Sequence, residues 1–230
     1  MTKSGVDQDA LIQMFSQASS KQGETLRKAV SDATLKAMQG RELSLANIRK
    51  VLKTVTEATT AGAAQSALPA ADVEVMLGKA VEGMDAALIQ AVEANRRALE
   101  QFVGQGVGLQ EKQMKSALSD LEKLEDTFFS AVTKAATAAG GTMAGPWQQV
   151  LDASRAKGSD AGAQAASAVE QVVAQAQTTL REGRATGLRA AQAMMDSYAA
   201  MVSGVLLGMS QGFKPAAAAH EPAEKAARRR

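Results

Sequence analysis

Few side chains in this sequence could act together in acid–base, nucleophilic or metal chemistry. There is no cysteine, which excludes a thiolate nucleophile, a cysteine metal site and a disulfide. The single histidine, His220, lies in an Ala/Pro-rich stretch that we expect to be disordered. Glu122 and Glu125 lie three residues apart on a lysine-rich helical face, a pattern typical of solvated ion pairs. We therefore predict no catalytic residues, no cofactor, no metal site and no small-molecule substrate.

Glycines in two patterns could serve binding rather than catalysis. The stretch "GQGVG" (104–108) follows no predicted strand, so it indicates a helix break and not a dinucleotide fingerprint. The spacing G-x-x-x-G lets two helix backbones approach closely, in lipid or in water. The uncharged run 197–213 contains Ser and Gln and is about the shortest that could span a bilayer, so we favour packing against another helix. The predicted close-packing glycines are Gly183, Gly187, Gly204, Gly208 and Gly212.

Large apolar residues are scarce, and they recur at helical spacing. Such residues form either a protein core or a face that adsorbs to an apolar phase. Methionine suits both, because its side chain is flexible and polarisable. Trp147 is either an interface anchor or a staple that seats the turn after Pro146, and we favour the staple. The predicted adsorbing or helix-packing residues are Phe102, Leu124, Phe128, Phe129, Met201, Leu206, Leu207 and Phe213.

The C-terminal segment 214–230, "KPAAAAHEPAEKAARRR", is basic and contains few apolar residues. Its composition predicts a disordered tail. The arginines and lysines could contact phosphates of nucleic acid or of anionic lipids, although Glu221 and Glu224 dilute the positive charge. A solubilising tail fits equally well. The residues that could contact an anion are Lys214, Lys225, Arg228, Arg229 and Arg230.

The elements that carry these residues are predicted to be helices. Alanine is the most frequent residue, apolar positions recur at steps of three and four, and no segment alternates as a strand does. One such stripe runs from Leu77 to Phe102 and another from Met114 to Ala135. Ser44, and Ser159 or Asp160, are predicted helix N-caps. The predicted fold class is all-α, with long antiparallel amphipathic helices forming an extended bundle or coiled coil.

Prolines and glycine-rich stretches divide the chain into four predicted segments. Residues 1–68 form a short-helix region ending in a linker around Pro69. Residues 69–140 form a long helical hairpin, and 141–213 form a second helical segment that ends in the glycine-ridge helix. Residues 214–230 form the tail. The N-terminal residues lack the apolar core of a secretory signal, so we expect a cytoplasmic protein that can associate with a granule or membrane surface.

The cysteine-free, Ala/Gln/Met-rich helices at 72–138 and 159–213, together with the Lys-Pro-Ala ending, resemble phasins, the helical proteins that coat bacterial polyhydroxyalkanoate granules. The resemblance covers about two thirds of the chain and is one of composition and pattern. Residues 1–68 have no evident counterpart, and the tail is shorter and less basic than in some phasins. The resemblance implies a non-enzymatic protein that adsorbs to a polyester granule and self-associates.

Three other functions fit the same sequence. A cytosolic self-assembling scaffold would use the apolar stripes only to bind protein. A peripheral membrane-active protein would insert residues 190–213 and distinguish anionic from neutral lipid. A nucleoid-associated protein would bind nucleic acid through the tail, with an affinity that falls steeply with salt.

Overall fold

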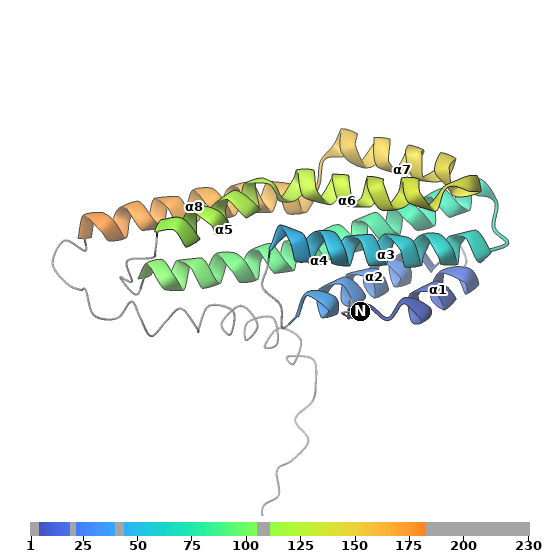
Figure 1. The fold of residues 1–230 in the computed structure, drawn as a ribbon, viewed down its shortest axis with the longest axis horizontal. Coiled ribbons are helices and arrows are strands. Elements are labelled where there is room, and N and C mark those ends of the chain that lie inside the picture. The colour runs from blue at the N-terminus through green and yellow to red at the C-terminus, as the bar shows by residue number, and fades with distance from the viewer. Residues whose placement is uncertain (1–4, 19–21, 40–43, 105–110, 183–230) are drawn as a thin grey trace, which may run out of the picture.

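The computed structural model describes residues 5–18, 22–39, 44–104 and 111–182. These residues form an all-α, elongated bundle, as predicted (Figure 1). The helices α4, α5 and α8 extend beyond the others at one end, and α1, α2, α3, α6 and α7 gather toward the opposite end. The helices are α1 (Gln8–Gln17), α2 (Gly23–Met38), α3 (Leu45–Gln65), α4 (Ala70–Gly104), α5 (Glu111–Glu122), α6 (Leu124–Ala139), α7 (Ala144–Lys157) and α8 (Asp160–Glu182), with a 3₁₀ turn at Gly141–Met143.

The longest helix, α4, is the centre of the bundle. It packs along α2 and α8, and also contacts α7 and α3. The predicted stripe from Leu77 to Phe102 is buried, which confirms it. Ala80, Ala87, Ala94 and Ala98 are buried as well, so α4 hides more of its circumference than one stripe. Alanine fits helix interior and helix surface alike, which is why the sequence did not distinguish this central helix from a peripheral one.

Local capping fixes where the helices begin. The Asp7 carboxylate accepts a hydrogen bond from the Ala10 N–H at 3.1 Å, and the Ser44 hydroxyl accepts one from the Asn47 N–H at 3.4 Å. The predicted cap at Ser44 is therefore confirmed. The helix α3 continues through "TTAGAAQ" to Gln65, so the connection to α4 is much shorter than the predicted linker. The threonine hydroxyls are satisfied within the helix by donating to carbonyls one turn earlier, as Thr60 does to Thr56.

The stripe from Met114 to Ala135 is interrupted once, at Lys123, where α5 ends and α6 begins. The Lys123 N–H still donates to Ser119, and the Lys123 carbonyl accepts from Thr127, so the axis bends without a loop. Within the predicted segment 69–140, α4 packs mainly on α2 and α8, whereas α6 packs mainly on α3. The two stripes therefore find different partners.

Two glycines mark places where helices touch backbone to backbone. A methyl group on Gly83 of α4 would lie 2.5 Å from the Arg27 carbonyl oxygen of α2. A methyl group on Gly62 of α3 would lie 2.5 Å from the Phe15 Cβ of α1. Both helix pairs therefore require glycine at the crossing. The five glycines predicted for this role, and the predicted tail, lie outside the described residues.

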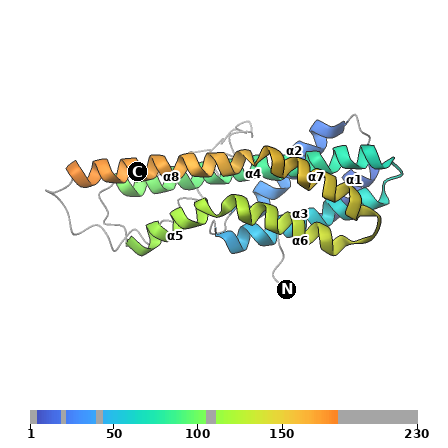
Figure 2. The ribbon, with the colours of Figure 1, turned by 90° about the horizontal axis from the view of Figure 1, so that it is seen from above.

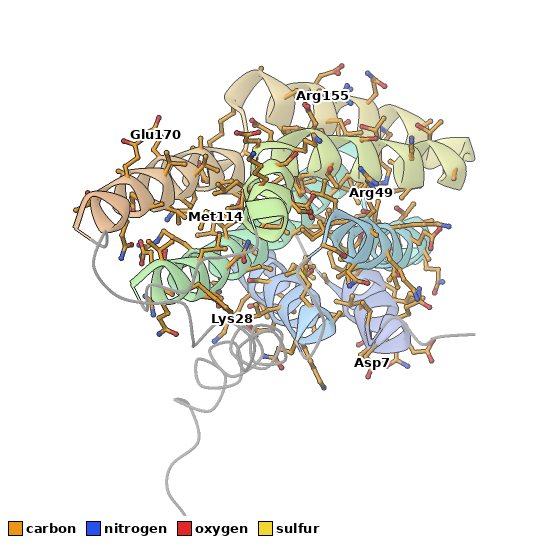
Figure 3. All side chains as sticks on the ribbon, turned by 60° about the vertical axis from the view of Figure 1, so that its left-hand side comes forward. Asp7, Lys28, Arg49, Met114, Arg155 and Glu170 are labelled. Atoms are coloured by element: carbon orange, nitrogen blue, oxygen red, sulfur yellow. The ribbon has the colours of Figure 1, made fainter. Side chains whose placement is uncertain are left out.

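Charged side chains cover the outside of the bundle. Lys28, Arg49 and Glu170 point away from the helices that carry them (Figure 3). The exposed large apolar residues in the described ranges are Met14, Val75 and Val173. Among the helices that the structure describes, none is long and apolar enough to cross a membrane.

Candidate functional site

The predicted apolar residues that the structure describes lie mainly inside the bundle. Phe102, Leu124 and Phe128 are 5 %, 1 % and 1 % exposed, so in this closed form they pack against protein. Phe129 is half-buried, its ring centroid 5.2 Å from that of Phe128 in an edge-to-face pair. The remaining predicted adsorbing residues (Met201, Leu206, Leu207 and Phe213) and the predicted anion-contacting residues lie outside the described ranges.

The ring face of Phe129 lies toward Arg155 of α7. The Arg155 guanidinium lies 6.0 Å from the centre of the Phe129 ring and donates a hydrogen bond to the Thr133 hydroxyl at 2.8 Å. Figure 3 shows Arg155 on the outer side of its helix. This contact links α7 to α6 at the surface and partly covers the phenylalanine pair.

A groove of about 440 Å³ runs between α4, α6, α7 and the start of α8. Its apolar lining comes from Val75, Val81, Phe128, Phe129 and Val150. Its acidic lining comes from Glu74, Glu82 and Asp85, with Lys157 opposite. Such a lining could accept an apolar group with a basic neighbour. The groove ends at the N-terminus of α8, where carboxylates of other helices accept hydrogen bonds from backbone N–H groups.

Two carboxylates from other helices hold the N-terminus of α8. Asp85 of α4 accepts hydrogen bonds from the N–H groups of Asp160 at 3.0 Å and Ala161 at 3.1 Å. Glu125 of α6 accepts from the Ser159 N–H at 2.8 Å. We call Asp85, Glu125 and the 159–162 backbone the α8 clasp. Because the first N–H groups of a helix have no partner within it and carry partial positive charge, carboxylates are favourable there.

Ser159 completes the clasp as the local N-cap, its hydroxyl accepting from the Gly162 N–H at 2.9 Å. Of the two caps predicted, Ser159 is therefore the correct one. Gly162 makes room for the clasp, since a methyl group there would lie 2.8 Å from the Glu125 carboxyl group and 2.8 Å from the Ser159 hydroxyl. Glu125 is thus not the solvated ion-pair residue that its spacing from Glu122 predicted.

Burial raises the pKa of the Asp85 carboxyl above its ordinary value, and the hydrogen bonds from Ala161 and Asp160 offset part of that effect. Burial by itself therefore favours the neutral form of the Asp85 carboxyl group. The two hydrogen bonds that Asp85 accepts orient α8 on α4. The clasp therefore positions the start of α8 through hydrogen bonds from three backbone N–H groups.

Beyond the clasp, α8 is held mainly by alanines. Its fully buried side chains are Ala161, Ala165, Ala168 and Val172, spaced at steps of four, three and four. The corresponding buried residues of α6 include Leu124, Phe128 and Val132, and those of α7 include Trp147 and Leu151. Because burial energy grows with apolar area, the alanine seam holds α8 less strongly than its neighbours are held.

The opposite end of the bundle has a polar group inside its core. The Trp147 indole N–H donates to the Thr60 hydroxyl at 2.9 Å, and Thr60 donates to the Thr56 carbonyl at 2.6 Å. The Thr56 hydroxyl lies 3.8 Å from the Met84 sulfur. Trp147 therefore seats α7 on α3, where the sequence predicted only a staple next to Pro146. Every buried side-chain N or O atom in the described part of the chain has a partner.

The far end, formed by α4, α5 and α8, is less completely buried. Met114, Ala117 and Leu118 of α5 and Val169 and Ala176 of α8 are only partly buried against the core. Val173 is 37 % exposed. In Figure 2, α4 and α8 lie side by side at this end and α5 diverges from them, while the other described helices lie toward the opposite end. Apolar side chains here therefore border solvent. Over the residues described, no group of three His, Asp or Glu side chains could hold a metal ion.

The fold and these contacts define an elongated all-α bundle whose last described helix is clasped at one end. The chain belongs to a family of unknown function (DUF6781), whose model matches residues 1–215. The match runs across the first three predicted segments, so residues 1–68 belong to the family together with the long helices. No curated protein and no solved structure matches the chain. The family does not identify a phasin, and that resemblance stays a prediction.

Sequence reasoning missed Asp85, Glu125 and Gly162 as positioning residues. No local pattern marks these residues. The backbone groups that bind the carboxylates of Glu125 and Asp85 lie 34 or more residues away along the chain. Gly162 lies three residues after the predicted cap Ser159. Its small size is the one feature of the sequence that could have indicated a close contact there. The buried alanines of α8 do recur at helical spacing. That spacing identifies the buried face only once α8 is known to pack against other helices.

Proposed function

We propose that this chain is a non-enzymatic amphipathic helical protein that coats an apolar surface and self-associates there. The surface that the phasin resemblance implies is a polyhydroxyalkanoate granule in the cytoplasm. The observation that carries the proposal is the graded burial along the bundle. Most large apolar residues of α1 to α3 are buried, with Met14 (36 % exposed) as an exception, whereas Met114, Leu118 and Val173 at the far end border solvent. An apolar phase would cover these residues at little cost, because they are already partly exposed.

The test is partition of the purified full-length protein between buffer, polyhydroxyalkanoate particles, neutral vesicles and anionic vesicles. A coat protein sediments with the polymer and is indifferent to lipid charge. The double variant Met114→Ser/Leu118→Ser should bind the particles more weakly. Val75→Ser is the matched control, because Val75 is 50 % exposed on α4 near the opposite end and should leave binding unchanged.

The residues outside the described ranges are tested in the same assay. Leu206→Ser/Leu207→Ser should reduce particle binding if the run 197–213 adsorbs, with Ser203→Ala as its control. Binding to anionic but not neutral vesicles would instead identify a peripheral membrane protein. Loss of nucleic-acid binding with rising salt, abolished by replacing Arg228, Arg229 and Arg230, would identify the tail as a nucleic-acid contact.

A second function is favoured by one observation. The stripes of α1 and α3, and those of α2 and α4, already pack against each other, which leaves a closed rod suited to end-to-end or side-by-side assembly. A cytosolic scaffold built from such rods would stay in buffer as a stable oligomer. Analytical ultracentrifugation of the same sample decides between the coat and the scaffold. A stable oligomer that stays in buffer would exclude the coat function.

A further inference from the structure

We propose that a second adsorbing surface, in addition to the partly exposed residues at the far end, is the seam between α4 and α8, uncovered when α8 leaves the bundle after the α8 clasp opens. This inference rests on the proposed coat function and names the helix that moves. It is carried by the clasp at one end of α8 and the alanine seam along its length.

The clasp concentrates the polar attachment of α8 at one place. Three consecutive backbone N–H groups, those of Ser159, Asp160 and Ala161, donate to carboxylates of α6 and α4 at 2.8 to 3.1 Å. Releasing Asp85 and Glu125 therefore frees the whole N-terminal turn at once. The ion pair from Lys157 to Asp160 at 3.8 Å joins two exposed side chains and adds little hold.

The seam itself resists separation weakly. From Ala161 to Ala168, α8 buries only single methyl groups, and beyond them Val172 is fully buried while Val173 is 37 % exposed. On α4, Val92 and Leu99 follow Asp85 at intervals of seven residues and so lie on the face that carries the clasp. Both are buried, and α8 runs along this half of α4 from Asp85 toward its C-terminus (Figure 1). Departure of α8 would therefore uncover Val92 and Leu99, whose side chains are larger than the alanines that α8 buries.

Gly162→Ala is expected to weaken the attachment of α8 to the bundle without lowering the helix propensity of α8. The added methyl group meets the flexible end of Glu125 and the Ser159 hydroxyl, each at 2.8 Å, so both clasp side chains must shift. Alanine at the same time favours the helical backbone. Gly145→Ala is the matched control, because it adds the same methyl group near the start of α7, where nothing lies within 4 Å. Glu125→Ala removes the same contact, and Glu125→Gln keeps an oxygen that accepts from Ser159.

The first measurement is amide hydrogen exchange over residues 163–178 in the free full-length protein. Gly162→Ala and Glu125→Ala should raise exchange there by roughly tenfold, the factor for loss of one hydrogen bond to a charged group. Gly145→Ala and Glu125→Gln should stay near wild type. Unchanged exchange in both clasp variants would overturn the proposal, because α8 would then be held by other contacts.

The second measurement is the rate of adsorption to polyhydroxyalkanoate particles. The two clasp variants should adsorb faster than wild type, by a factor similar to the gain in exchange. Faster exchange without faster adsorption would overturn the α4–α8 seam as an adsorbing surface while leaving the coat function standing. A wild-type protein that adsorbs to no particle would overturn both, and the two failures are thereby distinguished.

Discussion

At the scale of single residues, the strongest electrostatic perturbation lies on α4, away from the clasp. Arg96 donates to both carboxylate oxygens of Glu93 at 2.7 and 2.9 Å, and the Arg97 Nε donates to one of them at 2.8 Å. Arg96 also pairs with Glu100. The hydrogen bonds from Arg96, followed by those from Arg97, lower the pKa of Glu93 to about 2. Glu93 and Arg96 are each 20 % exposed, so water screens this network in part.

Glu93→Gln should lower the free energy of unfolding at pH 7 by about 1 kcal/mol, a value discounted for solvent screening. The folded pKa lies below the ordinary 4.5, so the stabilisation is present above pH 4.5 and is lost as the pH falls toward about 2. Urea unfolding between pH 7 and pH 2.5 checks this, and the wild-type and variant curves should converge on the acid side. Glu57→Gln, in the exposed pair with Lys53, is the control and should change stability by less than about 0.5 kcal/mol.

At the scale of elements, the crossing of α2 and α4 depends on glycine at position 83. Gly83→Ala should destabilise the protein by about 1–3 kcal/mol, because the methyl group meets the Arg27 backbone and the Val30 side chain and forces the helices apart. Gly78→Ala lies in the same helix with nothing within 4 Å of the new methyl group. It should instead stabilise by about 0.5–1 kcal/mol through helix propensity.

Chemical denaturation of the two variants measures this pair directly. If Gly83→Ala lowers the free energy of unfolding and Gly78→Ala raises it, the close crossing of α2 and α4 at Gly83 is supported. Equal effects would mean that α2 does not pack on Gly83 in solution. The comparison needs no knowledge of function, because each variant differs from wild type by one methyl group.

At the scale of the whole molecule, the buried side chains form one continuous core from Leu11 of α1 to Val172 of α8. We therefore expect residues 1–68 and the long helices to unfold together as one cooperative unit. Trp147 reports on this directly, since it packs α7 against α3. Far-UV circular dichroism and Trp147 fluorescence should give the same midpoint in urea. Two separated transitions would show instead that the N-terminal helices fold independently.

The sequence by itself determined the class of the fold and much of its local structure. Abundant alanine and apolar steps of three and four specify helices whatever surrounds them, because the period is a property of the helix. The same local logic found the caps at Ser44 and Ser159, which act within one turn. It also found the buried stripe of α4, since Leu77, Leu88 and Leu99 recur with other apolar residues at steps of three and four.

Only the tertiary structure decided which helices are neighbours and what the polar residues do. Glu125 looks like any solvated glutamate until α8 brings the Ser159 N–H to it from 34 residues away. The same holds for Asp85, for Gly83 and for the bond between Trp147 and Thr60. Alanine-rich stripes are nearly alike in size and polarity, so many helix pairings have similar energies. The choice among them is made by a few close crossings and long-range hydrogen bonds, which no local period encodes.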